Sequence, residues 1–138
     1  MLQTYKVTGG DFVNAGKASS SVKGILKQLN VLAGLIKRVV VALYEAEVNV
    51  AAHAYSGNIL VEIESDQVRI RVTDSGPGIE DIQMAMKEGF STASKEVREM
   101  GFGAGMGLAN IKKNSDTFNI TSVPGEGTTV EIINKLTD

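Results

Sequence analysis

The sequence contains no cysteine and a single histidine, His53, among its 138 residues. Without cysteine the chain can form neither a disulfide framework nor a thiolate metal site, and one histidine does not make a histidine-rich metal site. No apolar run approaches the roughly 20 residues that a membrane-spanning helix needs, and the N-terminus lacks a signal-peptide pattern. These absences predict a soluble, cytoplasmic protein with no membrane partner.

A strong excess of either charge is also missing. The 14 basic and 16 acidic residues give a formal net charge of −2 and a pI near 5.4. This balance argues against nucleic-acid binding as the main function. Aromatic residues make up only 5% of the chain but hydrophobic residues make up 43%, so the core must be mostly aliphatic. The length is typical of one domain, and we expect a single domain over residues 1–138.

The hydrophobic pattern predicts helices first and then strands interleaved with helices. In "NILVEIESDQVRIRVTDSGPG", which begins at residue 58, apolar and polar residues alternate, as in a half-buried pair of strands. The economical arrangement is an α+β fold with two layers, a mixed, mostly antiparallel sheet carrying helices on one face. The expected strands cover 3–8, the pair just quoted, 117–123 and 128–134, and the expected helices cover 11–29, 32–54, 80–88 and 107–114.

One carboxylate stands out in the second strand of the quoted pair. Asp74 has the same parity as the apolar residues Val68, Ile70 and Val72. Because side chains of alternate residues point to the same face of a strand, Asp74 is expected to point inward, towards the helix layer.

The long helix over residues 32–54 carries polar side chains on an otherwise apolar sequence. Glu45, Asn49 and His53 follow one another at intervals of four, so they form one stripe of the helix, beside small alanines. Such a stripe is either a solvent-exposed face or the wall of a ligand site. A solvated face usually carries several Lys or Glu residues, whereas this stripe has an amide and small neighbours.

The densest glycine cluster, "GFGAGMGLANI", comes directly before a predicted helix. The first turn of a helix offers unpaired N–H groups and the positive end of its dipole, which suits phosphates. A flexible loop with a tight turn is the alternative. The cluster is not a Walker A loop, because no G-K-[ST] follows, and no βαβ unit with a downstream acid makes it a dinucleotide fingerprint.

Four motifs in order resemble those of the GHKL ATP-binding superfamily, which includes gyrase, Hsp90, histidine kinases and MutL. They are "EAEVN", "DSGPG", "GFGAGMGL" and "GEGTT". Within that superfamily, "EGFSTAS" followed by "GFGAGMGLANIKKNSD" is most similar to the serine/threonine kinases of sigma-factor regulation, the anti-sigma and stress-switch kinases. The resemblance implies the histidine-kinase-like ATPase fold, with ATP and Mg²⁺ as ligands.

The resemblance also implies roles for individual residues. Glu45 matches the proposed general base, Asn49 the Mg²⁺-binding asparagine and Asp74 the adenine-recognising aspartate. Residues 89–105 match the polar ATP lid. The remaining implied nucleotide contacts are Gly76, Gly78, Arg98, Gly103, Gly105, Met106, Gly107, Leu108 and Thr128. His53 is interpreted as a packing residue, because the chain has no separate helix with an acceptor histidine.

By this resemblance the protein would phosphorylate a serine or threonine of a small partner, such as a STAS-type anti-sigma antagonist. Two alternatives stay open. One is a nucleotide-gated module that binds a sigma factor or another protein without phosphoryl transfer, and the other is a nucleotide-sensing accessory subunit. Homodimerisation through the first strand and helix also stays open.

Overall fold

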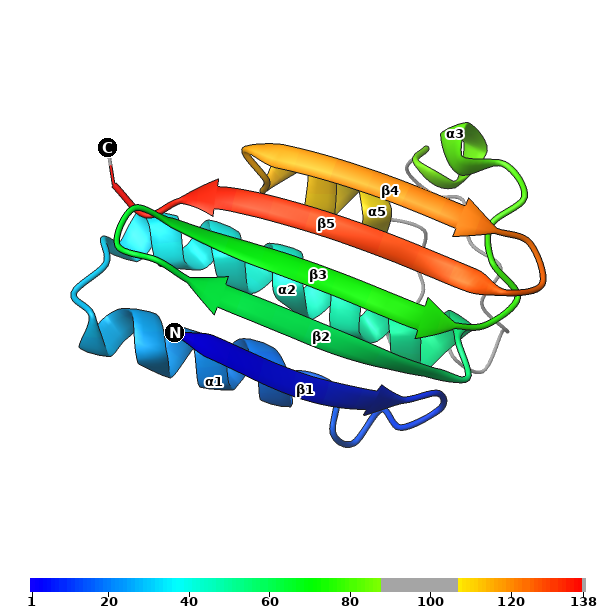
Figure 1. Cartoon of the computed structure of the whole chain (residues 1–138), viewed down its shortest axis with the longest axis horizontal. Helices are drawn as coiled ribbons and strands as arrows, with labels where there is room; N and C mark the ends of the chain where they lie inside the picture. The colour runs from blue at the N-terminus through cyan, green and yellow to red at the C-terminus, as the bar shows by residue number, and fades with distance from the viewer. Residues whose placement is uncertain (88–106, 138) are drawn as a thin grey trace.

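The computed structural model describes residues 1–87 and 107–137, and its centre is one five-stranded sheet (Figure 1). The strand order is β1-β2-β3-β5-β4, and all four pairings between these strands are antiparallel. The two-layer α+β fold is therefore confirmed, with an antiparallel sheet in place of the mixed one predicted. The strands are β1 (Leu2–Thr8), β2 (Ser56–Ile63), β3 (Gln67–Ser75), β4 (Thr117–Val123) and β5 (Gly127–Lys135).

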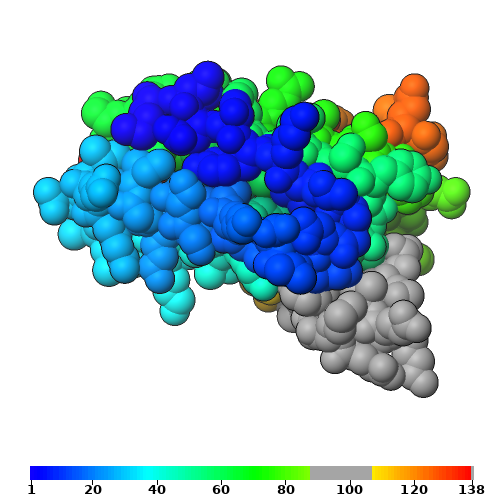
Figure 2. Space-filling model, turned by 90° about the horizontal axis from the view of Figure 1, so that it is seen from below, coloured from blue at the N-terminus to red at the C-terminus, as the bar shows by residue number. Residues whose placement is uncertain are grey.

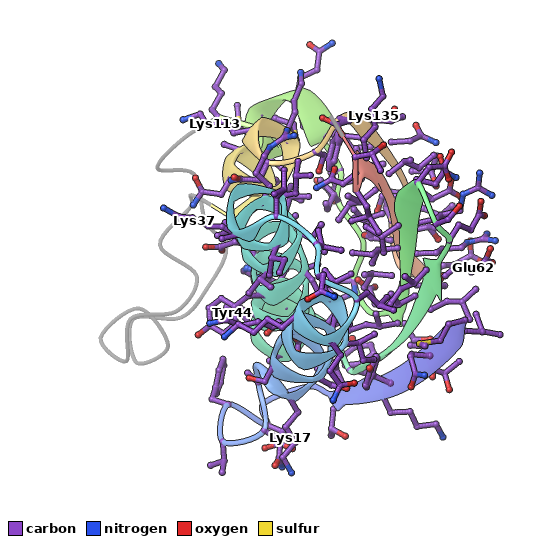
Figure 3. All side chains as sticks on the ribbon, turned by 90° about the vertical axis from the view of Figure 1, so that its left-hand side faces the viewer. Lys17, Lys37, Tyr44, Glu62, Lys113 and Lys135 are labelled. Atoms are coloured by element: carbon purple, nitrogen blue, oxygen red, sulfur yellow. The ribbon has the colours of Figure 1, made fainter. Side chains whose placement is uncertain are left out.

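Helices α1 (Lys17–Gln28), α2 (Ala33–His53) and α5 (Gly107–Lys113) cover one face of the sheet, and Figure 3 shows the two layers edge-on. The alternating pattern of β2, β3 and β5 buries one set of side chains against these helices, with Val61, Ile70 and Ile132 fully inaccessible. Among the described residues, no helix is long and apolar enough to span a membrane.

Two helices are shorter in the structure than the sequence pattern predicted. The helix expected over 11–29 begins only at Lys17, because the preceding segment turns and binds the end of α2. There the amide of Gly9 donates to the carbonyl of Tyr55 and the amide of Gly10 to that of Ala51, both at 2.8 Å. The helix expected over 80–88 contains only α3 (Ile82–Ala85) within the described residues.

The position of α1 depends on a carboxylate from α2 that the sequence pattern did not single out as a contact. Glu47 is 1% exposed and accepts hydrogen bonds from the backbone amides of Gly16, Ala18 and Ser19 at 2.9, 3.2 and 2.7 Å. These amides lie at the start of α1, where no earlier turn supplies acceptors and an acidic group is favoured by the helix dipole. Glu47 therefore caps α1 from 28 to 31 residues away.

Candidate functional site

The end of β3 and the start of β5 meet at Asp74. Its Oδ1 accepts a hydrogen bond from the amide of Thr128 at 3.1 Å, and the hydroxyls of Thr128 and Ser122 lie 2.8 Å apart. Asp74 is half-buried, as its inward parity predicted. Burial raises the pKa of Asp74 above its ordinary value, and the hydrogen bond from Thr128 partly opposes that change. A carboxylate keeps acceptor capacity beyond one such bond, so Asp74 can also receive an amine.

The two small glycine motifs are hydrogen-bonded to each other beside Asp74. The amide of Gly76 donates to the carbonyl of Glu126 at 3.1 Å, and the amide of Gly125 donates to the carbonyl of Pro77 at 2.7 Å. Gly78 has a φ of +73°, and a Cβ there would lie 2.5 Å from the carbonyl oxygen of Val123. Glycine at 78 is thus required by the close approach of "DSGPG" and "PGEG", whatever else binds there.

The polar stripe of α2 faces α5. The structure places the amide group of Asn49 against Gly107, the first residue of α5, where an added Cβ would lie 2.8 Å from Asn49 Oδ1. One turn along α5, Asn110 Nδ2 lies 3.5 Å from Glu45 Oε1, a long contact between the two helices. The alternative of a purely solvent-exposed stripe is therefore wrong, because Glu45 and Asn49 line the junction of α2 with the N-terminus of α5.

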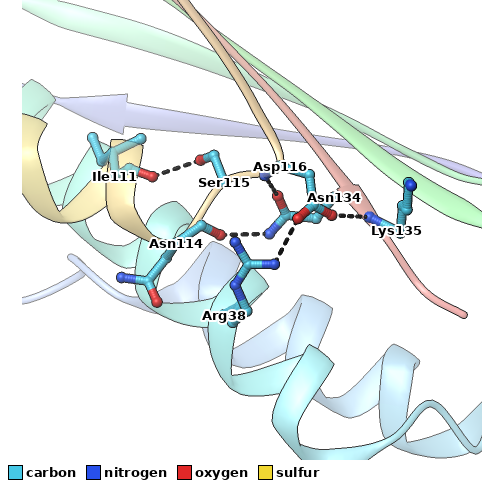
Figure 4. A network of polar contacts seen from close by, with 7 residues as sticks. All are labelled: Arg38, Ile111, Asn114, Ser115, Asp116, Asn134 and Lys135. Atoms are coloured by element: carbon cyan, nitrogen blue, oxygen red, sulfur yellow. Dashed lines mark hydrogen bonds and ion pairs between the residues drawn. The ribbon is translucent and has the colours of Figure 1, made fainter. Parts of the chain in front are cut away.

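The far end of the same junction is held by a network around Asp116 (Figure 4). Arg38 Nη1 donates to Asp116 Oδ1 at 2.7 Å, and the amide of Lys135 donates to Asp116 Oδ2 at 2.7 Å. The bond from Arg38 and the bond from Lys135 hold the pKa of Asp116 below its usual range. The buried Asn134 accepts from the amide of Asp116 and donates to the carbonyl of Asn114, both at 2.8 Å. These contacts fix the end of α5 to α2 and β5.

The C-terminal end of α2 brings these parts together. Asn49 lies against Gly107, and the next turn of the helix brings Ala54 to Gly76, where an added Cβ would lie 3.0 Å from Ala54 Cα. Five residues of helix span about 7.5 Å, so the α5 junction and the glycine motif beside Asp74 are neighbours. His53 is the last residue of α2, and burial lowers its pKa, which favours the neutral imidazole.

Several predicted site residues lie outside the described part of the chain. These are Arg98, Gly103, Gly105 and Met106, together with the whole segment 89–105. Gly107 and Leu108 are described and form the start of α5, with Leu108 packed on the core. The structure thus brings together Glu45, Asn49, Gly107 and Leu108 at one junction, and Asp74, Gly76, Gly78 and Thr128 beside it.

The donor groups of this region fit a magnesium ion held mostly by a substrate. Within residues 1–87 and 107–137 there is no group of three His, Cys, Asp or Glu side chains placed to hold a metal. The amide oxygen of Asn49 lies at the N-terminus of α5, which suits anionic ligands. Mg²⁺ commonly takes one or two protein oxygens and completes its shell with water and substrate phosphates.

Sequence reasoning missed Ser122 and Asn110. The hydroxyl of Ser122 accepts from the amide of Ile79 at 2.7 Å and lies next to Thr128, so it joins the two glycine motifs. The antiparallel register pairs Ser122 with Thr128, and this pairing was the signal that could have found it once the final two strands were aligned. No local signal indicated Asn110, since its contact is with another helix.

The comparisons with known proteins agree with this geometry. A family model described as histidine kinase-, DNA gyrase B-, and HSP90-like ATPase matches residues 34–138. The chain is 36% identical over 100 residues to the serine/threonine-protein kinase RsbT of Bacillus subtilis, covering 70% of this chain and 69% of that protein. It is 32% identical over 130 residues to an anti-sigma F factor of Pasteuria penetrans, covering 89% and 83%. The mycobacterial sensor histidine kinase MprB shares the fold, with a TM-score of 0.52 at 20% identity over 72% of this chain and 71% of that chain.

Proposed function

Because the chain belongs to the histidine kinase-, DNA gyrase B- and HSP90-like ATPase family, which uses ATP, we propose that it is a serine/threonine protein kinase of the anti-sigma regulatory type. The observation that carries the proposal is the 36% identity to the serine/threonine-protein kinase RsbT, in a chain that places a carboxylate and an amide at one helix N-terminus. In this proposal residues 1–138 act as one catalytic domain.

Glu45 is the proposed general base. Its carboxylate lies at the junction of α2 with α5, where the phosphates of ATP would meet the N-terminus of α5. There it accepts the proton from the serine or threonine hydroxyl of the protein substrate as that oxygen attacks the γ-phosphorus and ADP leaves. Asn110 Nδ2 lies 3.5 Å from Glu45 Oε1, a long contact across this junction.

The nucleotide would span from Asp74 to α5. Asp74 accepts a hydrogen bond from the exocyclic amine of adenine, with Thr128 and Gly76 beside it, while Gly78 shapes the adjoining turn. Gly107 and Leu108 present their amides to the phosphates, and the proposed contribution of Arg98, Gly103, Gly105 and Met106 comes from the segment outside the described residues. Asn49 would hold Mg²⁺, which would supply positive charge beside the phosphates.

The names of the same relatives also suggest which kind of protein this chain acts on. The chain is similar to proteins named as a kinase and as anti-sigma factors, so its substrate is proposed to be a regulatory protein such as a STAS-type anti-sigma antagonist. Phosphorylation would add about −2 of charge at an interface and so break or create a complex.

A second candidate is a nucleotide-gated module that binds a sigma factor without phosphoryl transfer. The observation in its favour is that the relatives covering most of this chain, including those of Pasteuria penetrans and Caldanaerobacter subterraneus, are named anti-sigma F factors. Their name describes an action on another protein and does not itself describe catalysis.

An assay of phosphoryl transfer distinguishes the proposed kinase from the nucleotide-gated binding module. Partners isolated from native extract are incubated with the protein, Mg²⁺ and γ-labelled ATP, and label is located on serine or threonine. Replacing Glu45 with Ala should lower the transfer rate by about 10²- to 10⁴-fold, the usual contribution of a general base, while ATP still binds. The exposed Glu64 provides the matched control, because Glu64→Ala changes the same charge in the β2–β3 turn.

Two outcomes would contradict this assignment in different ways. Normal transfer by Glu45→Ala would remove Glu45 from the role of base but keep the kinase. Stable partners without label, from protein that binds ATP, would overturn the kinase and support the binding module.

A further inference from the structure

A groove about 630 Å³ in volume runs between α1 and α2 on the outside of the helix layer. It lies at the end where α1 stops and α2 begins, and neither Glu45 nor Asn49 lines it. Its lining comes from the second half of α1, the connecting residues and the first half of α2, and consists of Lys23, Lys27, Asn30, Val31, Leu32, Ala33, Ile36, Lys37, Val40 and Val41.

A second hollow continues this groove along the first half of α1. It measures about 570 Å³ and shares Lys23 and Val40 with the first, and it extends to Tyr44 and Lys17. Together the two follow the whole of α1, which at 12 residues is about 18 Å long. Figure 2 views the molecule from the side on which α1 and β1 lie. The combined depression, here called the α1–α2 groove, is long enough for an α-helix of three to four turns.

The apolar floor of the α1–α2 groove is incompletely covered by the described residues. Val40 and Val41 are half-buried, and Leu32 and Tyr44 are 56% and 38% exposed. Figure 3 shows Tyr44 and Lys37 projecting from the helices away from the sheet, whereas Glu62 projects on the opposite side. Val40, Val41 and Tyr44 make part of the outer face of α2 apolar, and an apolar helix face without a covering element is suited to packing against another helix.

The charge around the α1–α2 groove is of one sign. Residues 12–44 contain five cationic side chains, Lys17, Lys23, Lys27, Lys37 and Arg38, and no acidic one. Because the whole chain carries −2 and this stretch carries +5, the rest of the chain carries −7. Arg38 pairs with Asp116 at the other side of α2, but Lys23, Lys27 and Lys37 are exposed and line the groove. The basic region is thus a local feature of an acidic protein.

We propose that the α1–α2 groove binds an acidic amphipathic helix of a partner protein. Apolar residues of that helix would pack on Leu32, Val40 and Tyr44, and its flanking carboxylates would meet the lysines of the rim, the arrangement of a helix in a hydrophobic groove. The site is separate from the nucleotide site, so the proposal does not rest on kinase activity.

Two other occupants fit the groove less well. A second copy of the chain packed symmetrically through this face would bring the lysines of one copy against those of the other, because a two-fold interface joins the same patch on both subunits. An anionic membrane favours apolar side chains that protrude from a basic face. Here the half-buried Val31, Val40 and Val41 line a recess between two helices, which matches a convex helix.

The test uses two labelled synthetic helices of about 18 residues with the same leucine stripe, one flanked by glutamates and the other by lysines. Fluorescence anisotropy should show that the acidic peptide binds about tenfold more tightly than the basic one. The double variant Lys27→Glu/Lys37→Glu should bind the acidic peptide about tenfold more weakly than the parent protein does. The matched control Lys6→Glu/Lys135→Glu changes two exposed lysines on the strands and should leave binding within about twofold.

Amide chemical shifts of the isotope-labelled protein locate the binding and show whether each variant is folded. The proposal expects the acidic peptide to shift amides within residues 17–44 more than those of β4 and β5. Equal binding of both peptides, equal loss in the control variant, or shifts centred elsewhere would overturn it. So would binding to phosphatidylserine vesicles without binding of the peptide, or a doubled mass in solution that the Lys27→Glu/Lys37→Glu variant abolishes.

Discussion

Glu45 and Glu47 are two positions apart on α2, and their side chains lie in different surroundings. Two positions correspond to roughly 200° around a helix, so the two carboxylates point to opposite flanks. Glu45 is half-buried near Asn110 at the start of α5, whereas Glu47 is buried and receives three amides from the start of α1. The same chemical group therefore serves a proposed catalytic junction on one side and a structural cap on the other.

Asp74 is the residue at which stability and binding are expected to oppose each other. Burial raises its pKa, so the folded protein holds this proton more tightly than the unfolded chain does. When the pKa of a carboxyl group is higher in the folded state than in the unfolded state, the protein loses stability as the pH rises from the lower of these two values through the higher one. At neutral pH the ionised Asp74 therefore costs folding free energy, while the proposed contact with adenine needs that ionised acceptor.

Replacing Asp74 with Asn should separate the two effects. At pH 7 the free energy of unfolding of Asp74→Asn, measured in urea, should be at least that of the parent, because the amide oxygen can still accept from Thr128 and no charge is buried. Calorimetry should show adenine nucleotide affinity reduced by about tenfold or more, since hydrogen bonds to charged groups contribute about 1.5–3 kcal/mol. Asp66→Asn, at an exposed aspartate in the turn between β2 and β3, is the control.

Acidification tests the same residue without mutation. Because the pKa of Asp74 is raised, nucleotide affinity should begin to fall at a higher pH than the titration of an ordinary aspartate would give, and Asp74→Asn should lack this step. Unchanged affinity in Asp74→Asn, or an identical pH profile in both proteins, would remove Asp74 from the site.

At the scale of elements, α1 and α5 flank α2, and a buried polar residue distant in sequence helps to hold each of them. Glu47 of α2 holds the start of α1, and Asn134 of β5 holds the connection that follows α5. Both residues are only 1% exposed. Each bonds backbone groups that are buried or partly buried, and leaving such groups without partners costs free energy.

Replacing Glu47 with Ala should lower the free energy of unfolding by about 2–4 kcal/mol, because three amides lose their acceptor and a charged hydrogen-bond partner is removed. Urea denaturation measures this change. Glu45→Ala, two positions away, removes only one long contact and should change stability by less than about 1 kcal/mol. Equal losses in the two variants would show that Glu47 does not act as the cap of α1.

Replacing Asn134 with Ala should also cost about 2–4 kcal/mol, since the amide of Asp116 and the carbonyl of Asn114 both lose their partner. The exposed Asn119 of β4 gives a matched control, and Asn119→Ala should stay within about 0.5 kcal/mol of the parent. Amide exchange should rise in α5 and β4 of Asn134→Ala. Unchanged exchange there would mean that other contacts position α5.

At the scale of the whole molecule, the proposed site exists only in the folded chain. Its described members extend from Glu45 to Thr128 and come from α2, β3, the segment after β3, α5 and β5. A ligand of such a site binds the folded state and not the unfolded one. It therefore stabilises the complete fold by mass action.

Saturation with ATP and Mg²⁺ should raise the free energy of unfolding by about 2.7 kcal/mol when the free nucleotide is a hundredfold above its dissociation constant. Thermal unfolding followed by circular dichroism, at several ATP concentrations, measures this effect. Asp74→Asn should need correspondingly more ATP for the same shift. A melting temperature independent of ATP would contradict the proposed nucleotide site as a whole.

Much of the fold and part of the site follow from local sequence patterns. The alternation along β2 and β3 predicted both strands and the inward direction of Asp74, because side chains repeat every second residue in a strand. The four-residue spacing of Glu45 and Asn49 predicted their shared stripe, because a helix repeats every 3.6 residues. The four ordered motifs predicted the family that the comparisons then identified.

Only the tertiary structure decided what each stripe and each lone polar residue faces. Periodicity reports which residues share a face of their own element, and it contains no information about the partner across the interface. Glu47 as the cap of α1 and Asn110 beside Glu45 each depend on packing between residues 28 or more positions apart, and the groove depends on how α1 packs against α2. These contacts form because the antiparallel sheet sets the positions of all the helices at once, and no local segment determines that arrangement.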